Sequence, residues 1–296
     1  MTASIEQLQR HEIPGRVAIV AGHGGLPKVV VTTGVSTAEI YLHGAHVTAF
    51  QKQGEAPLLF LSGKSHFAAD QPIRGGVPIC FPWFGPREGQ PAHGYARLAD
   101  WDLVATTELS GDSVRVHLRL PEAVTRAHAF GGTVDFLVTV GDRLTMELQV
   151  TNTTSGPLSF EECLHTYFSI GDIGQVAVAG LQGKTYWDKV GGLSQKQETA
   201  DAIRFGSEVD RVYPGATEAV EIRDAAGHRT IRVEKSGSAS TVVWNPWVAK
   251  AKAMADFGDD EFQRMVCVES GNVGPDTISL APAQSSSLKV VLSSRS

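Results

Sequence analysis

The segment TVDFLVTVGDRLTMELQV, residues 133–150, reads as two β-strands joined by a short turn. Apolar residues occupy every second position of its second half, residues 144–150. Because side chains alternate between the two faces of a strand, this period of two turns one face toward a core and the other toward water. Residues 141–143, Gly-Asp-Arg, have hairpin length and supply a turn glycine. The segment therefore predicts an antiparallel hairpin with one buried face.

The same alternation recurs along most of the chain. Residues 114–120 repeat it, with Arg115, His117 and Arg119 on the face predicted to meet water. Between Gly, Asp and Ser turns, strands are also predicted at 28–34, 38–50, 158–168, 175–180, 219–223, 229–235, 239–244, 264–269 and 287–293. About a dozen short strands are typical of an antiparallel sandwich or barrel. We therefore predict an all-β protein.

Helical patterns are few. Residues 4–13 predict a short leading helix. A second helix is predicted to begin with Asn245 as N-cap and Pro246 at the first helical position. It is predicted to run through residues 247–257 and to end at Gly258.

The composition is that of an ordinary globular protein. Of the 296 residues, 42% are hydrophobic and 20% are charged, which argues against a disordered chain. No solenoid repeat or low-complexity linker divides the sequence, so we expect one domain over residues 1–296, with the leading helix inside residues 1–14. The net charge of −6 and the lack of a Lys/Arg run exclude nucleic acid as a general partner.

Cysteine usage and the lack of targeting segments predict the cellular location. Cys80, Cys163 and Cys267 lie far apart in apolar segments, which indicates reduced thiols rather than a disulfide framework. The first residues show no basic segment before an apolar core, and no apolar run has the length of a membrane span. We therefore expect a cytoplasmic protein with no membrane partner.

Two reactive side chains lie in apolar surroundings. Read as a strand, EECLHTYFSI places residues 161, 163, 165 and 167, which include His165, on one face. In MVCVESGNV, Glu269 follows an apolar run and shares a face with Cys267. A lone histidine in such a strand is more often a core residue than a catalyst, whereas a carboxylate is almost never buried without a partner. Together the two groups could form an acid–base pair.

Two further motifs carry cations. In QPIRGGVPICFPWFGP, residues 71–86, Arg74 beside two glycines could present its guanidinium where the backbone leaves room for a ligand. The alternative is a structural loop that caps the core, with Arg74 paired to a carboxylate. In PAHGYARLADW, residues 91–101, His93 and Arg97 fall on one face of an extended chain. Two arginines in one cleft would suit a phosphate or carboxylate, although Arg97 alone is more often a surface or ion-pairing residue.

Other chemistries are weaker. Metal-ligating atoms occur in Cys163, His165, Cys267 and Glu269. C-x-H and C-x-E are not the spacings of structural zinc sites, so we predict no metal. Apolar flanks raise the pKa of a cysteine thiol, which argues against a thiol nucleophile. GHGG, residues 22–25, lacks the lysine of a phosphate loop, so no nucleotide cofactor is predicted.

Six motifs, in order between residues 71 and 273, resemble one known family. They are RGGVPICFPWFGP, HGYARLADW, LHTYFSIGDI, EVDRVYP, WNPW and VCVESGNV. The set is similar to that of the hexose-6-phosphate mutarotases, the glucose-6-phosphate 1-epimerase branch of the aldose 1-epimerase superfamily. The resemblance implies a galactose-mutarotase-like β-supersandwich of antiparallel strands with few short helices. It also implies a protein without metal or cofactor that interconverts the α and β anomers of glucose 6-phosphate and related sugar phosphates. We expect this protein to be a monomer.

The resemblance also assigns roles to residues. It places the catalytic histidine at His165 and the catalytic glutamate at Glu269. The substrate-binding residues that it implies are Arg74, His93, Arg97 and Asp210. Spacing alone predicts otherwise for Asp210, since an aspartate before a Tyr-Pro-Gly turn usually caps its own backbone. Relatives often carry glutamine where this chain has Ala92, so we expect one sugar or phosphate contact to be missing or supplied elsewhere.

Mutarotation needs one base and one acid. Ionised Glu269, with an ordinary carboxyl pKa of about 4.3, is expected to take the proton of the C1 hydroxyl. Imidazolium His165 is expected to give a proton to the ring oxygen, with Glu161 or Glu162 helping it to keep that proton. Two alternatives stay open: a mutarotase for unphosphorylated aldoses, and a non-catalytic sugar-phosphate-binding regulatory protein on the same scaffold.

Overall fold

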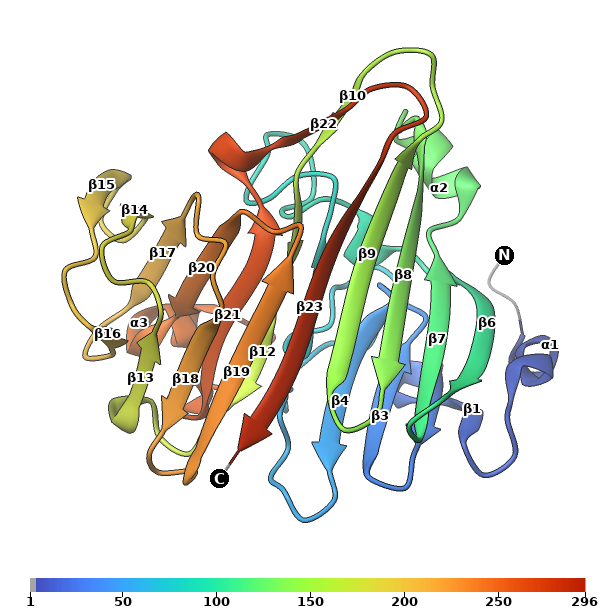
Figure 1. Cartoon of the computed structure of the whole chain (residues 1–296), viewed down its shortest axis with the longest axis horizontal. Coiled ribbons are helices and arrows are strands. Elements are labelled where there is room, and N and C mark those ends of the chain that lie inside the picture. Colours follow the sequence, from blue (N-terminus) through green and yellow to red (C-terminus); the bar gives the residue numbers. More distant parts are fainter. Residues whose placement is uncertain (1–3, 296) are drawn as a thin grey trace.

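The computed structural model describes residues 4–295, and antiparallel strands are its main regular structure (Figure 1). One sheet contains, in spatial order, β16 (Ala202–Arg204), β13 (Val176–Ala179), β18 (Val220–Asp224), β19 (Arg229–Ser236), β23 (Ser285–Arg295), β9 (Leu144–Asn152), β8 (Gly132–Val140), β7 (Ser113–Arg119) and β6 (Asp102–Leu109). A second contains β15 (Ser194–Gln197), β14 (Thr185–Asp188), β17 (Val209–Tyr213), β20 (Ser240–Asn245), β21 (Met265–Asn272), β11 (Glu162–Leu164) and β5 (Ile79–Cys80), and β12 (Tyr167–Ser169) also pairs with β21. The prediction of an all-β protein is confirmed.

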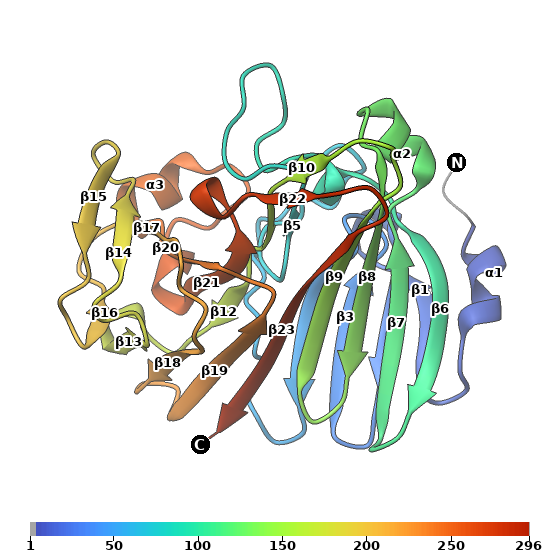
Figure 2. The ribbon, with the colours of Figure 1, turned by 45° about the horizontal axis from the view of Figure 1, so that its top comes forward.

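Two smaller sheets complete the architecture. They are β1 (Val17–Ala21), β2 (Pro27–Thr32), β3 (Ser36–Tyr41) and β4 (His46–Lys52) in one, and β10 (Leu158–Phe160) with β22 (Ile278–Leu280) in the other. Figure 2 shows β3 behind β8 and β9, so that the first small sheet and the nine-stranded sheet form two layers. One hydrophobic core, with members from Leu8 to Leu292, contains side chains from both layers and from the second sheet, to which β21 belongs. Such a core is what a single domain over residues 1–296 requires, and one domain remains our prediction.

The hairpin of β8 and β9 forms as predicted. Val140 pairs with Leu144 at the turn, and Gly132 pairs with Asn152 at the far end. The alternate apolar residues of β9, at positions 144, 146, 148 and 150, are completely buried. The period of two therefore identified the inward face correctly.

One predicted strand is in fact two. Residues 38–50 divide into β3 and β4, which pair with each other around a turn. Gly44 and Ala45 adopt φ of 72° and 47°, a left-handed conformation that a strand does not contain. Gly44, within the apolar run, indicates this turn, and the prediction did not use it.

A second predicted strand, residues 158–168, divides into β10, β11 and β12. The His165 N–H donates to the carbonyl of Pro78, but Pro78 has no N–H to donate in return, so the ladder is interrupted there. The register along β21 nevertheless continues. Leu164 pairs with Ser270 and Tyr167 pairs with Cys267, which places His165 opposite Glu269.

The helices are short. They are α1 (Ile5–Leu8), α2 (Glu122–Ala127) and α3 (Trp247–Ala253). The Asn245 side chain accepts from the Trp247 N–H, as an N-terminal cap should, although Asn245 itself ends β20. The predicted end at Gly258 is wrong, because the backbone becomes extended at Met254. Among residues 4–295, no helix combines the length and apolar character that crossing a bilayer requires.

Candidate active site

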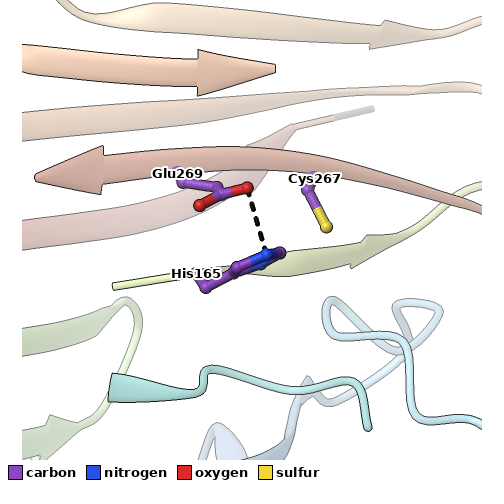
Figure 3. Close-up of side chains that lie close together, drawn as sticks. All are labelled: His165, Cys267 and Glu269. Atoms are coloured by element: carbon purple, nitrogen blue, oxygen red, sulfur yellow. Dashed lines mark ion pairs between the residues drawn. The ribbon is translucent and has the colours of Figure 1, made fainter. Parts of the chain in front are cut away.

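His165 and Glu269 touch at the centre of the second sheet (Figure 3). His165 Nε2 lies 3.3 Å from Glu269 Oε1, and the two residues are only 8% and 1% exposed. Glu269 follows an apolar run and was expected to need a partner, and the imidazole is that partner. Strand register thus brings together the two groups that the sequence predicts as an acid–base pair.

Thiols flank the pair. Cys163 Sγ lies 3.6 Å from Glu269 Oε2, and Cys267 offers its sulfur to the same cluster. Cys163 and His165 therefore share a face, as predicted. Glu161 does not join them, because its carboxylate accepts hydrogen bonds from the backbone N–H groups of Phe84 and Gly274.

Aromatic rings fix the plane of the His165 imidazole. The Tyr167 ring stacks on it, with centroids 4.9 Å apart and planes 13° apart. The rings of Trp244 and His93 meet it edge-on at centroid distances of 5.9 and 5.7 Å. His165 Nδ1 is buried and has no hydrogen-bond partner among the described residues.

Burial opposes charge on both members of the pair. It lowers the pKa of His165 well below the ordinary value, and the positive charges of Arg74 and Arg97 lower it further. It raises the pKa of Glu269 well above the ordinary value, and the neighbouring Asp210 raises it further. Both shifts favour the uncharged forms, in the opposite direction to the expected imidazolium beside an ionised carboxylate.

Glu162 does not help His165 to keep a proton. Its Oε1 accepts from Asn272 Nδ2 at 2.9 Å, and its Oε2 is buried without a partner among the described residues. Burial raises the pKa of Glu162 to about 8, so this carboxyl is itself protonated at neutral pH. Glu162 is next to Cys163 in β11, and neighbouring positions of a strand face opposite sides. Its side chain therefore also points away from His165 and Glu269.

Arg74 is held on two sides. Its Nε and Nη2 each lie 3.0 Å from Asp256 Oδ2, and its Nη1 donates to the Tyr167 hydroxyl at 3.0 Å. The predicted alternative of an ion-paired arginine is thus realised, with Asp256 as the partner. The adjacent glycines serve packing rather than ligand access: a Cβ at Gly75 would lie 2.5 Å from the Phe60 carbonyl oxygen.

Within residues 4–295, Arg97 is held by a single hydrogen bond. Its Nη2 donates to the backbone oxygen of Ala92 at 2.7 Å, and its Nε is buried without a partner among the described residues. No carboxylate of residues 4–295 lies within ion-pair distance of it, so the ion-pairing alternative is wrong, while the side chain is partly exposed. Burial lowers the pKa of Arg97, as expected for a cation without a counterion. Ala92 has no side chain to offer a sugar, but its carbonyl positions this guanidinium.

Asp210 faces two lysines. Its carboxylate lies 3.6 Å from Lys189 Nζ and 3.8 Å from Lys250 Nζ. No hydrogen bond to its own backbone neighbours occurs in the described chain, so the reading of Asp210 as a turn cap is wrong. Asp210 pairs in register with Trp244, which pairs with Cys267, so Asp210 lies two strands from the strand of Glu269.

Lys189 is the site residue that the sequence did not reveal. Its ammonium lies 5.6 Å from the centre of the Phe84 ring. Its positive charge contributes to the lowered pKa of His93 and offsets part of the rise in the pKa of Glu269. A cavity of about 370 Å³ adjoins the site between Phe84, Trp187 and Lys189. In the sequence, Lys189 precedes a Val-Gly-Gly turn, where a solvated lysine is the ordinary expectation.

His93 is neutral and strained. Its backbone is left-handed, with φ of 64°, and its Nδ1 accepts from the Gly85 N–H at 3.2 Å. Burial and then Arg97 lower the pKa of His93 to about 3. Because Nδ1 is the acceptor, Nε2 carries the hydrogen and is a donor for a ligand.

Comparison with known proteins identifies the family. The family model described as aldose 1-epimerase matches residues 27–293, almost the whole chain. The chain belongs to the aldose 1-epimerase family. A protein of Cenchrus ciliaris named "Putative glucose-6-phosphate 1-epimerase" is 37% identical over 286 residues, which cover 93% of this chain and 87% of that protein.

Solved structures of aldose 1-epimerase type share the fold. The crystal structure of "a putative mutarotase (YeaD)" from Salmonella typhimurium superposes with a TM-score of 0.88 at 31% identity, over 96% of this chain and 95% of that one. A galactose mutarotase-like protein from Clostridium acetobutylicum gives a TM-score of 0.70 at 14% identity, over 94% and 98% of the two chains. The predicted galactose-mutarotase-like fold is confirmed, and membership of the aldose 1-epimerase family makes a sugar the expected small-molecule partner.

Proposed function

We propose that this member of the aldose 1-epimerase family is a hexose-6-phosphate mutarotase acting on glucose 6-phosphate and related sugar phosphates. The observation that carries the proposal is the contact between His165 and Glu269 in the positive field of three side chains, Arg74, Arg97 and Lys189. Of these, Arg97 has no carboxylate partner in residues 4–295. Leaving a charge buried and unpaired is destabilising, and a phosphate dianion supplies the missing charge. The names of the similar proteins, glucose-6-phosphate 1-epimerase and mutarotase, support the same substrate class.

The pair holds one transferable proton. A neutral imidazole beside a carboxylic acid and an imidazolium beside a carboxylate are two placements of that proton across the 3.3 Å gap between His165 and Glu269. In either placement one member donates and the other accepts, which is what mutarotation requires. The empty site favours the proton on Glu269, because burial penalises two charges.

The substrate phosphate would move this proton to His165. Burial is the largest cause of the lowered pKa of His165, and the charges of His93, Arg74 and Arg97 add to it; a phosphate dianion at the two arginines would offset their part. His165 then carries the acid proton, and Glu269 is the base. The phosphate is therefore part of the proposed mechanism as well as a handle for binding.

The proposed reaction is balanced in protons. Glu269 takes the C1 hydroxyl proton while His165 gives a proton to the ring oxygen, the bond between C1 and that oxygen breaks, and an aldehyde forms. Rotation about the bond between C1 and C2 presents the other face of the aldehyde. The ring oxygen then attacks C1 and returns its proton to His165, while Glu269 protonates the carbonyl oxygen. Asp210 is proposed to accept sugar hydroxyls and His93 Nε2 to donate to one.

The test follows pure α-glucose 6-phosphate to anomeric equilibrium by NMR exchange at neutral pH, in a buffer without phosphate. We expect wild type to accelerate the approach to equilibrium, and His165→Ala and Glu269→Gln each to lose roughly 100-fold or more of that acceleration. Binding of the sugar phosphate without acceleration would instead support the non-catalytic alternative. No acceleration and no binding would refute the proposal for this substrate.

One observation favours a second candidate, a mutarotase for unphosphorylated aldoses. The Nε edge of Arg74 is already occupied by Asp256, so only part of its fork is free for a phosphate. Free glucose, run beside glucose 6-phosphate, separates the two candidates. Equal acceleration of both sugars would favour the second, and a marked preference for the phosphorylated sugar would favour the first.

A further inference from the structure

Three metal-ligating atoms converge inside the candidate site (Figure 3). They belong to His165, Cys267 and Glu269, lie within 4.8 Å of one another, and come from buried side chains. Cys267 and Glu269 are two positions apart on β21 and share a face, while His165 comes from the segment that joins β11 to β12. The spacing argument against a metal compared C-x-H and C-x-E with structural zinc motifs, whereas the cluster here is defined by the positions of its atoms in space.

We propose that this cluster binds a thiophilic divalent cation such as Zn²⁺, and that the bound metal excludes the hexose from the acid–base pair. The metal is an inhibitor in this proposal, and it has no part in mutarotation. Metal binding is independent of the proposed function, whereas the inhibition rests on it.

The distances suit a tetrahedral ion. Zn²⁺ binds sulfur at about 2.3 Å and nitrogen at about 2.0 Å, so two of its ligands lie about 3.4 Å apart. His165 Nε2 and Glu269 Oε1 are already 3.3 Å apart. The widest gap in the cluster is at most 4.8 Å, and a side-chain movement of roughly 1 Å would close it to a tetrahedral edge. Three protein ligands leave the fourth position to water, as in zinc sites with an open position.

The charges also suit the ion. A thiolate from Cys267 and a carboxylate from Glu269 balance the two charges of Zn²⁺, so the buried site gains no net charge. The protons of the thiol and of the carboxyl leave to solvent as the metal enters. The third ligand, the imidazole of His165, binds a metal in its neutral form and adds no charge.

Metal and sugar would compete for the same atoms. The reacting C1 hydroxyl and ring oxygen must reach Glu269 and His165, and an ion on both groups removes the base and the acid together. Zn²⁺ should therefore raise the apparent KM for glucose 6-phosphate without lowering kcat at saturating sugar. A chelator should restore the original KM.

The test titrates the full-length protein with Cd²⁺ alone, and the ultraviolet charge-transfer band of a cadmium–thiolate bond reports binding without any activity assay. Zn²⁺ affinity is measured in parallel by calorimetry in a non-chelating buffer. We expect one ion per chain for wild type and for Cys80→Ala, the matched control that removes another fully buried free thiol. Cys267→Ala should lose the band, and its Zn²⁺ affinity should fall about tenfold or more.

Glu269→Gln provides a second reading if Cys267→Ala fails to fold, because it keeps the side-chain size and removes an anionic ligand. It should weaken Zn²⁺ by about tenfold or more. A wild-type protein that shows no cadmium–thiolate band would overturn the proposal. So would a Cys267→Ala protein that keeps the band, or bound Zn²⁺ that leaves the KM of an active enzyme unchanged. If the protein catalyses no anomerisation at all, the band still decides whether the metal site exists.

Discussion

The guanidinium of Arg74 donates a hydrogen bond to the hydroxyl of Tyr167, with 3.0 Å between Nη1 and the oxygen. The same Tyr167 ring stacks on His165. One side chain therefore connects a cation proposed to bind phosphate with an imidazole proposed to transfer a proton. Its hydroxyl serves the first group and its ring serves the second, so the two contributions can be separated by substitution.

Tyr167→Phe should raise the KM for glucose 6-phosphate by roughly three- to tenfold and leave kcat nearly unchanged. The variant loses a hydrogen bond to a charged group but keeps the stacked ring. Steady-state kinetics with phosphorylated and free glucose checks this, with Tyr186→Phe as the control, because the Tyr186 hydroxyl makes no hydrogen bond in the described chain. A fall in kcat with unchanged KM would show that the hydroxyl acts on the chemical step instead.

Arg97→Met should weaken glucose 6-phosphate binding about tenfold or more and yet stabilise the ligand-free protein. The substitution removes charge-assisted hydrogen bonds to phosphate. It also removes a partly buried cation that has no carboxylate partner within residues 4–295, which should raise the free energy of unfolding slightly, by less than about 1 kcal/mol. Calorimetric titration and urea unfolding measure the two effects, with Arg126→Ala on α2 as the control. A variant that is less stable than wild type would contradict the assignment of Arg97 as an unpaired charge.

Inorganic phosphate offers a direct check on the same residue. It should raise the Tm of wild type, because a ligand that binds only the folded state stabilises it. The Tm of Arg97→Met should respond much less. An equal response in both proteins would place the phosphate at another site.

Stability should fall with rising pH because of Glu162. Its pKa is about 8 when folded and about 4.3 in an unfolded chain. The folded state therefore binds more protons between these values, and the stability present below about pH 4.3 is lost as pH rises through about 8. The slope is at most about 1.4 kcal/mol per pH unit. Glu162→Gln should abolish this component in urea unfolding across pH 5 to about 9, whereas Glu88→Gln in an exposed loop should retain it.

The pH dependence of catalysis should differ between kcat/KM and kcat. The pKa of His165 is lowered well below 6.5 in the free enzyme, and below that pKa both groups are protonated and no base remains. The acidic limb of kcat/KM should therefore lie well below pH 6.5 when rates are referred to the phosphate dianion. The acidic limb of the kcat profile should lie at higher pH, because the bound phosphate offsets the arginine charges and so raises the pKa of His165. Coincident limbs would contradict the proposed effect of phosphate on His165.

The sequence predicted most strands but only part of the site. Alternation placed Cys163 and His165 on one face correctly, because the two residues are only two positions apart in an extended segment. The partner of Arg74 is Asp256, 182 residues away, and no local pattern predicts such a contact. Lys189 was missed for the same reason, since its role depends on Asp210 and Phe84 across the fold. The proton placement was also misjudged, because it depends on how deeply the pair is buried.

The unbroken register along β21 limits how this enzyme can change. Residues 165 and 166, between β11 and β12, belong to neither strand. The pairs Leu164–Ser270 and Tyr167–Cys267 on either side nevertheless follow one continuous register along β21. Adding or deleting one residue there would turn the His165 imidazole to the opposite side of the sheet. Changes in chain length are thus excluded at the reacting centre. Differences in sugar preference among relatives should instead arise in the surrounding loops, such as residues 84–93 and 189–193, whose length no strand fixes.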